Sequence, residues 1–443
     1  MAVWNSVRFN NLAEDLRIDA EHYRPEYLRQ TKVVSSLPHK KLIETARVSD
    51  GNHLTIASRF TDVGVRYLRG QDLSDFFISD VDPLYIPETD YTALSRSHMK
   101  PGDVLVGIVG TIGSVALVTE RHGKLTGSCK LAIVRPHALA SEYVAAYLAS
   151  TPGQNEMQRR IRGAVQMGLI LPDLKDIPIP IPSDSQSKLI VGVVRASQIQ
   201  RTNATRHYAE AEALLLSSLG LNKLDLSPSL FYVRHYSDSI TAGRVDAEYF
   251  SPRYQRVLNH LRQGGQTIGD VAPLAERKFQ AEAGATFSYI EIGNLAGNGE
   301  ARAEMMDGGD APSRAQWIVQ PGDVISSTVR PIRRLSALIS KEQAGHVCSS
   351  GFAVLHPTGI EPEVLLVYLR LPIVCEILDL HTTASMYPAI PVEQLLRIPI
   401  ALPATSVRDR IVDKVRAAFA ARREAARLLD EAKSTVERLI LEN

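Results

Sequence analysis

The chain has 443 residues, too many for one ordinary hydrophobic core and enough for about two or three domains. Hydrophobic residues make up 44% and charged residues 22%, which excludes a disordered or fibrous protein. No stretch approaches the roughly 18 apolar residues of a membrane helix. The 50 Lys and Arg residues balance 49 Asp and Glu residues, so the whole chain lacks the basic excess expected of a nucleic-acid-binding protein, although a locally basic groove stays compatible with this balance.

The three cysteines are Cys129, Cys348 and Cys375. An odd number without a CxxC pair argues against a disulfide framework and against a thiolate zinc site. The histidines are scattered, with no i, i+4 pair that would indicate a metal. We therefore expect the cysteines to act as small buried apolar residues in a reducing cytoplasm, with no metal bound. The polar start of the chain, residues 1–10, does not resemble a secretory signal.

The first 182 residues predict a β-rich domain. A short helical pattern covers residues 20–28, and a second one covers residues 141–150. The Pro-Gly-Asp sequence at 101–103 predicts a turn before a strand, and the Gly-Thr-Ile-Gly sequence at 110–113 predicts a tight loop between strands. Alternating prolines at 177–182 continue neither a helix nor a central strand, so they end the globular part. The strand-like segments are 63–68, 104–109, 115–118 and 131–134.

Two long segments, residues 185–221 and 407–441, contain no proline and have apolar residues at helical spacing. Each predicts a helix of roughly 35 residues, or about 50 Å. A lone helix of this kind exposes an apolar stripe and needs a partner. We therefore predict that the two helices pack together as an antiparallel coiled coil and hold two globular domains a fixed distance apart. The alternative, in which each helix packs on its own domain, stays open.

An internal repeat is the strongest signal in the sequence. RIDAEHYRPEY at 17–27 recurs as RVDAEYFSPRY at 244–254, with six of eleven positions identical and an offset of 227 residues. Four further pairs follow in the same order, with offsets between 220 and 222. These pairs are YLRGQDL (67–73) with YIEIGNL (289–295), PGDV (101–104) with PGDV (321–324), EYVAAYL (142–148) with EVLLVYL (363–369), and LKDIPIPIP (174–182) with LLRIPIALP (395–403). The order and the nearly constant offset predict a tandem duplication of a unit of about 220 residues, the size of a domain with an appendage.

The repeated motifs resemble those of the specificity (S) subunits of type I restriction-modification systems. PGDVLV at 101–106 followed by GTIG at 110–113 is similar to one family pattern within a target recognition domain, and PGDVISSTVRP at 321–331 is similar to another. The proline-marked exits at 176–182 and 397–403 resemble the junction that precedes each conserved helix of the family. One departure concerns the helix starts: the usual Glu-Gln pair is reduced to Ser185-Gln186 in the first unit and is absent in the second. The resemblance covers nearly the whole chain.

The resemblance implies an α+β fold with two tandem β-rich α/β target recognition domains, each followed by a long helix, and pseudo-twofold symmetry. The implied boundaries are a first recognition domain (1–182), a first spacer helix (183–222), a linker with the second recognition domain (223–403) and a second spacer helix (404–443). In this family each recognition domain reads a half-site of double-stranded DNA. Two methyltransferase (M) subunits bind the S subunit and methylate adenine with S-adenosylmethionine, and endonuclease (R) subunits can join. A duplicated reader with a rigid spacer suits a bipartite DNA site.

Candidate DNA contacts fall in two places. Three arginines of a predicted loop at 330–334 can bridge phosphates or pair with guanine, and a polar stretch of the first domain offers further donors. An ordinary solvated surface explains each of these residues equally well or better. The nominated residues are Arg59, Arg66, Arg69, Gln71, Lys124, Lys130, Arg330, Arg333 and Arg334.

The sequence contains no phosphate-binding GxxxxGK(S/T) loop, no HExxH, no GxSxG and no adenine-methyltransferase tetrapeptide. We therefore expect a non-catalytic subunit that binds neither a metal nor a cofactor itself and has no membrane partner. A structural adaptor that kept the scaffold but lost base readout is the alternative, favoured by the near-zero net charge. A single-chain enzyme with a cleft between the repeats is a third hypothesis, disfavoured by the missing motifs.

Overall fold

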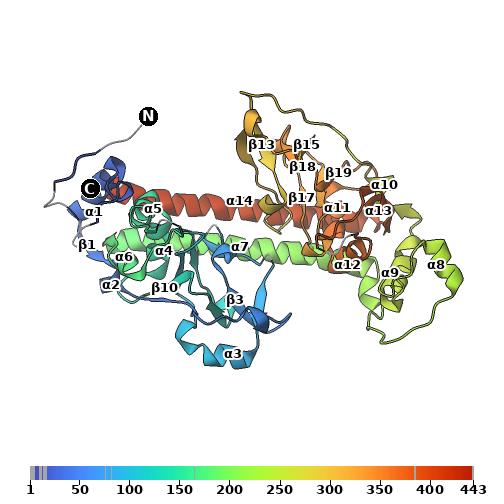
Figure 1. Ribbon diagram of the computed structural model, residues 1–443, viewed down its shortest axis with the longest axis horizontal. Helices are drawn as coiled ribbons and strands as arrows, with labels where there is room; N and C mark the ends of the chain where they lie inside the picture. Colours follow the sequence, from blue (N-terminus) through green and yellow to red (C-terminus); the bar gives the residue numbers. More distant parts are fainter. Residues whose placement is uncertain are drawn as a thin grey trace. The chain divides into compact units, whose positions relative to one another are not determined.

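The structure is a computed structural model that describes residues 5–8, 12, 17–74, 76–80, 82–163, 165–383 and 386–441. The fold is α+β, as the sequence predicts, and includes two long helices, α7 (Asp184–Ser218) and α14 (Thr405–Leu441) (Figure 1). The chain divides into two compact units. Unit 1 takes in residues up to Thr202 together with those from Ala421 onward, and unit 2 comprises Asn203–Ala420.

Unit 1 is built around a four-stranded antiparallel sheet with the order β2-β10-β7-β8. All four residues of β7 are buried, and successive side chains enter different cores: Val104 and Val106 pack with the helices, whereas Leu105 packs in a smaller cluster on the other face. A second sheet, β6-β3-β9, pairs β3 with β9 in parallel. The strands are β2 (Ala46–Asp50), β3 (Val65–Leu68), β6 (Leu84–Ile86), β7 (Val104–Gly107), β8 (Val115–Leu117) and β9 (Leu125–Gly127), with β10 (Leu131–Pro136) and the short pair β4 (Leu73–Ser74) and β5 (Phe77–Ile78).

Two predicted boundaries in this unit are wrong for local reasons. The strand predicted from residue 63 begins at Val65, because Val63 is exposed and Gly64 has a φ of 144°. The helix predicted over residues 20–28 is a 3₁₀ turn (Glu21–Tyr23) followed by α1 (Pro25–Ser36). Pro25 sets the break, since proline favours the first helical position and keeps the residue before it extended.

The helices of unit 1 pack beside the proline-rich exit. β11 (Pro178–Pro180) pairs with β1 (His39–Lys41) in a two-stranded ribbon, an edge position that tolerates prolines. Two buried tyrosines of α4 (Ser141–Ala149) hold this ribbon: Tyr143 Oη donates to Pro180 O at 2.8 Å and Tyr147 Oη to Pro178 O at 2.6 Å. The other helices are α2 (Leu42–Thr45), α3 (Glu88–Ala93), α5 (Thr151–Gln158) and α6 (Leu171–Lys175).

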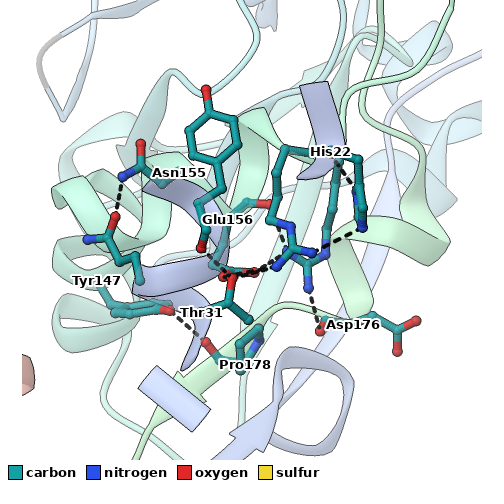
Figure 2. A network of polar contacts seen from close by, with 11 residues as sticks. His22, Thr31, Tyr147, Asn155, Glu156, Asp176 and Pro178 are labelled. Atoms are coloured by element: carbon teal, nitrogen blue, oxygen red, sulfur yellow. Dashed lines mark hydrogen bonds and ion pairs between the residues drawn. The ribbon is translucent and has the colours of Figure 1, made fainter. Parts of the chain in front are cut away.

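A buried polar network joins α1 to α5 (Figure 2). The Glu156 carboxylate is 1% exposed and accepts hydrogen bonds from Thr31 and from Arg160. His22 Nδ1 lies 2.8 Å from the carbonyl oxygen of Arg159, and its Nε2 lies 3.1 Å from the Arg159 guanidinium. Burial and the nearby Arg159 lower the pKa of His22, which keeps the imidazole neutral, so that Nδ1–H donates and Nε2 accepts.

We expect Glu156→Gln to lower the free energy of unfolding by about 1–3 kcal/mol, because the substitution removes a buried counter-charge from two guanidiniums that are themselves mostly buried. Urea denaturation measures the change. Glu142→Gln is the matched control: its partner Arg195 has a side chain 65% exposed, so its loss should cost less than about 1 kcal/mol. Equal unfolding midpoints for the two variants would contradict the role assigned to Glu156.

Unit 2 contains a four-stranded sheet, β14-β13-β18-β15, in which β13 pairs in parallel with β18, and a three-stranded antiparallel sheet, β17-β16-β19. Its core is dominated by α11 (Pro362–Arg370), whose residues from Glu363 onward are all buried. The strands are β13 (Thr286–Ile290), β14 (Glu304–Asp307), β15 (Ala315–Ile318), β16 (Val324–Ser327), β17 (Ser336–Leu338), β18 (Val347–Ser349) and β19 (Phe352–Leu355), with the short pair β12 (Gln266–Thr267) and β20 (Pro399–Ile400). The other helices are α8 (Tyr236–Ala242), α9 (Pro252–Arg262), α10 (Ile268–Val271), α12 (Pro372–Leu380) and α13 (Val392–Leu396).

The repeated Pro-Gly-Asp sequences are turns that end in buried carboxylates. In unit 1 the Asp103 carboxylate is 1% exposed, accepts from the Lys100 amide at 2.7 Å and forms an ion pair with Arg135. In unit 2 the Asp323 carboxylate is fully buried and accepts from the Gln320 amide at 2.7 Å. Each carboxylate thus closes its turn and neutralises a neighbouring cation, which explains the motif as a structural one.

Each unit contains a segment of both long helices. In unit 1, Ile190 and Val194 of α7 share a core with Leu429 and Val436 of α14 and with the β7 side chains. In unit 2, the Glu210 carboxylate of α7 forms an ion pair with Lys414 of α14 at 2.5 Å. Helix-to-helix contacts and contacts between helix and domain therefore occur within the same unit.

Candidate nucleic-acid interface

Two loops of unit 1 lie side by side where strand β7 of the four-stranded sheet ends. The first is the β7–β8 loop, residues 108–114, and the second is residues 162–168. Val109 forms a bridge with Gly168, and the Leu169 amide donates to Ile108 O at 2.9 Å. The second loop is closed by reciprocal 2.8 Å hydrogen bonds between the Arg162 and Gly168 backbones. We call these two segments the unit 1 loop pair.

Two of the predicted contact residues lie next to the unit 1 loop pair. The Ile108 amide donates to the carbonyl oxygen of Lys130 at 2.9 Å, so the exposed Lys130 flanks the first loop. A Cβ added to Gly70 would lie 2.6 Å from Thr111 Oγ1, which places the exposed Gln71 beside the same loop. The structure therefore groups Gln71 and Lys130 with the Gly-Thr-Ile-Gly sequence, which is a loop between strands as predicted.

Unit 2 has a corresponding loop pair, residues 328–334 and 383–389. Val329 forms a bridge with Ala389, and the Arg330 amide donates to Pro388 O at 2.8 Å. Arg330 has a φ of 49°, in the left-handed region that a side chain rarely adopts. Its guanidinium carbon lies 5.6 Å from the centre of the Tyr387 ring, a cation–π contact at the surface. We call these two segments the unit 2 loop pair.

A polar side chain, half-buried in unit 1 and buried in unit 2, anchors the loop that follows the Pro-Gly-Asp strand in each unit. In unit 1, Gln154 Nε2 donates to Gly113 O and to Leu148 O, both at 2.8 Å. In unit 2, the Arg370 guanidinium is 4% exposed and donates to Arg334 O at 2.7 Å, to Gly297 O at 2.6 Å and to Tyr208 Oη at 2.8 Å. These hydrogen bonds hold Gly113 and Arg334 in place, and direct readout of bases requires anchored positions of this kind.

The three arginines predicted for the loop at 330–334 have different environments. Arg330 and Arg333 are exposed. Arg334 instead points inward: its guanidinium forms an ion pair with Glu212 and donates to Arg370 O at 2.6 Å. Burial raises the pKa of Glu212, and the adjacent arginines act against that rise. Arg334 therefore holds the loop, and Arg330 and Arg333 are the two that can reach a ligand.

The remaining predicted residues lie elsewhere in unit 1 and have internal partners. The Arg66 side chain is 10% exposed and donates to Ser79 O at 3.0 Å, and Arg69 forms an ion pair with the buried Asp72 at 2.9 Å. Arg59 and Lys124 both pair with carboxylates of α3, Asp90 and Glu88 respectively. Of these four, Arg59 and Lys124 are exposed, whereas Arg66 and Arg69 mainly hold the turn that follows β3.

Sequence reasoning missed the apolar residues at the loop tips. Val165 is fully exposed and Met167 is 55% exposed in unit 1, while Met386 and Tyr387 are 75% and 68% exposed in unit 2. Apolar side chains in short loops lack the 3.6- or 2-residue period that marks a core face, so the pattern analysis passed over them. Val165 and Met386 occupy equivalent positions in the two repeats, and this equivalence was the one available signal.

His381 lies between the unit 2 loop pair and the repeated motif of this unit. Its ring packs edge-on against Tyr249 at 5.5 Å, and burial lowers its pKa to about 4. Because the folded pKa lies below the unfolded value near 6.5, protons bind the unfolded chain first as the pH falls. We expect the free energy of unfolding to drop between pH 6.5 and 4, by about 1 kcal/mol at pH 5 for this group after allowance for solvent screening. Urea curves at pH 7.5 and 5 should show a smaller drop for His381→Gln than for the wild type, and identical drops would contradict the prediction.

None of the described helices is long and apolar enough to cross a membrane. Within the described ranges, no group of three or more His, Cys, Asp and Glu side chains is arranged to hold a metal ion. Cys348 and Cys375 are buried, as expected, and burial raises the pKa of both thiols to about 12, whereas Cys129 is half-buried.

Comparison with known proteins gives one curated relative. No family model matches the chain. The specificity subunit of the type I restriction enzyme HindI from Haemophilus influenzae is 21% identical over 151 residues, a match that spans 33% of this chain and 33% of that protein. The chain thus matches about a third of the length of this relative.

Three of the solved structures that match this chain do so over most of both chains, with low similarity scores. The S subunit of a type I restriction-modification system from M. genitalium has a TM-score of 0.38 at 10% identity, covering 91% of this chain and 94% of that one. A chain from a study of the assembly and conformational transition of a type I system scores 0.29 at 15% identity, with coverage of 91% and 98%. The HsdS subunit from Thermoanaerobacter tengcongensis scores 0.29 at 17% identity, with coverage of 90% and 95%. The similarity of this chain to specificity subunits of type I restriction-modification systems, expected from its repeated motifs, is confirmed by the curated relative.

Proposed function

We propose that the chain is the DNA-reading specificity subunit of a type I restriction-modification complex and has no catalytic activity of its own. The observation that carries the proposal is the loop pair found in each unit, anchored by a polar side chain and placed after the same Pro-Gly-Asp turn. In this proposal residues 1–182 and 223–403 form the two recognition domains, and residues 183–222 and 404–443 form the spacer helices. Each loop pair reads one half of a bipartite double-stranded site.

Matching hydrogen bonds support a tandem duplication. In unit 1, Arg17 pairs with Asp19 and donates to the carbonyl oxygen of Ile161, just beyond α5. In unit 2, Arg244 pairs with Asp246 at 2.6 Å and donates to Leu380 O, at the end of α12, at 2.8 Å. The repeated Arg-x-Asp motif therefore makes similar contacts in both units, one to the Asp of the motif and one to a backbone carbonyl near the end of a helix. The simplest origin is one ancestral unit copied in tandem.

The long helices supply the spacer in this proposal. Unit 1 combines the early part of α7 with the late part of α14, and unit 2 combines the late part of α7 with the early part of α14. This is the order that antiparallel pairing of two helices requires. We propose that the paired helices set the half-site spacing and that two methyltransferase subunits bind the resulting pseudo-twofold scaffold, with S-adenosylmethionine bound by those subunits. Endonuclease subunits complete the restriction form of the complex.

A structural adaptor without base readout is the second candidate. The near-zero net charge favours it, as does the internal pairing of Arg66, Arg69 and Arg334. Reader and adaptor differ in one property, the dependence of DNA binding on sequence.

Matched loop-tip variants of the complex test the proposal. The chain is purified with a type I methyltransferase subunit of its source organism, and binding to a randomised pool of DNA duplexes is followed by sequencing. We expect Val165→Ser with Met167→Ser to alter selection at one half-site, and Met386→Ser with Tyr387→Ser to alter it at the other. Binding without sequence preference by the wild-type complex would favour the adaptor instead.

A further inference from the structure

Unit 1 contains a basic hollow that the loop pairs do not include. Its volume is about 450 Å³, and its lining includes five cationic side chains, those of Arg47, Arg96, Lys100, Arg135 and Lys175, together with the imidazole of His98. The remaining lining residues are apolar or hydroxyl-bearing, with no acidic side chain among them. We call this feature the basic hollow. On a chain with a net charge of +1, it is a marked local concentration of positive charge.

Strand pairing creates the basic hollow. Arg47 of β2 lies directly opposite Arg135 of β10 in the antiparallel register. Like charges in this position destabilise a sheet unless other groups compensate for them. Arg135 is compensated by the buried Asp103, to which it donates at 2.7 and 2.6 Å. Arg47 is exposed and has no ion-pair or hydrogen-bond partner for its side chain among the described residues.

The other cations of the basic hollow are only partly compensated. Arg96 lies 3.3 Å from the Asp50 carboxylate, which His53 also contacts at 2.6 Å. Within the part of the chain that the structure describes, the Lys100 and Lys175 ammonium groups have no carboxylate partner. Three cationic side chains, those of Arg47, Lys100 and Lys175, therefore face one open hollow without counter-charges of their own.

We propose that the basic hollow binds phosphate groups of the DNA backbone, outside the bases that the loop pairs read. This inference rests on the proposed function. Long cationic side chains recognise charge rather than base edges. No Phe, Tyr or Trp ring lines the hollow, and one face of the His98 imidazole is already stacked on Tyr91 at 3.7 Å. Phosphate contacts of this kind position a protein on the duplex and contribute equally for every sequence. The hollow would thus provide a locally basic surface on a chain whose net charge is close to zero.

The test compares two triple variants of the chain in its complex with the methyltransferase. Arg47→Gln/Lys100→Gln/Lys175→Gln removes the three uncompensated charges. Arg29→Gln/Lys32→Gln/Lys188→Gln removes three charges from exposed positions on α1 and α7 and serves as the control. Affinity for a duplex of about 30 base pairs is measured across a series of salt concentrations, with a target duplex and an unrelated duplex. We expect the hollow variant to bind both duplexes about 10–100-fold more weakly than the wild type. The slope of the logarithm of the binding constant against the logarithm of the salt concentration should fall in magnitude by about 2–3. The control should match the wild type in both quantities.

The outcomes separate this inference from the proposed function. If the hollow variant keeps the affinity, the salt dependence and the sequence preference of the wild type, phosphate binding by the basic hollow is excluded. The proposed reading function is then unaffected. If the wild-type complex binds DNA without sequence preference and the hollow variant binds DNA more weakly than the wild type, the basic hollow is supported and the proposed reading function is excluded. A free-phosphate site is the other source of the same chemistry. Millimolar pyrophosphate could stabilise the wild type against unfolding but not the hollow variant, while both bind DNA with equal affinity. This result would overturn the assignment of the hollow to the DNA backbone.

Discussion

Replacing Arg370 with methionine is expected to lower the free energy of unfolding by about 3–5 kcal/mol, among the largest effects of any single substitution in the chain. The Arg370 guanidinium is almost completely buried and donates to Arg334 O, Gly297 O and Tyr208 Oη. Methionine has a similar length but no donor, so these acceptors would lose their partner in a site that water does not reach. Each unpaired buried acceptor costs about 1–3 kcal/mol.

Arg206→Met is the matched control for Arg370→Met. Arg206 lies on α7 within unit 2, its side chain is 56% exposed and its partner is Glu210, one helical turn away. An exposed pair of this kind contributes less than about 1 kcal/mol. Urea or thermal unfolding of the two variants gives the comparison. A loss below about 1 kcal/mol for Arg370→Met would contradict the anchoring of the unit 2 loop pair by this residue.

The second large effect is expected at the unit 2 loop pair. Arg330→Ala combined with Arg333→Ala should weaken binding to the target duplex about 100-fold, because a well-placed arginine–guanine pair contributes about 1–3 kcal/mol of discrimination. The loss should fall on one half-site: base changes in the half read by unit 2 should cease to matter, while the other half stays discriminated. Competition binding with singly substituted duplexes measures both effects.

Arg206→Ala combined with Arg427→Ala is the control for the loop variant. Both residues are exposed, lie on long helices and pair with neighbours on the same helix. The control removes the same charge and should leave discrimination at both half-sites unchanged. Equal weakening by the two double variants would show a general charge effect, and no weakening by the loop variant would exclude Arg330 and Arg333 as readers.

The α+β class and the two long helices were predictable from the sequence because their patterns are local. A proline-free run with apolar residues every three or four positions predicts a helix without knowledge of its partner. The structure gives α7 and α14 within a few residues of the predicted ends. The helix predicted at 20–28 failed because Pro25 divides it into a 3₁₀ turn and α1, a local effect that the apolar pattern does not contain.

The candidate site was predictable only in part. The repeat identified the loops at 110–113 and 330–334, since two copies of a Pro-Gly-Asp turn mark the strand that precedes each loop. The sequence could not separate Arg334, which pairs inward with Glu212, from the exposed Arg330, because that difference depends on a residue more than 100 positions away. The basic hollow was invisible for a similar reason: strand register, not sequence proximity, places Arg47 opposite Arg135.

Genome-wide mapping of adenine methylation tests the central claim most directly. The chain is expressed with a type I methyltransferase subunit of its source organism in a host that lacks other adenine methylation, and modified adenines are located by sequencing. A specificity subunit with two reading units predicts methylation at one split motif, with the unit 1 and unit 2 loop-tip variants each relaxing a different half of it. A stable complex that leaves the host DNA unmethylated, or that methylates without a motif, would contradict the account.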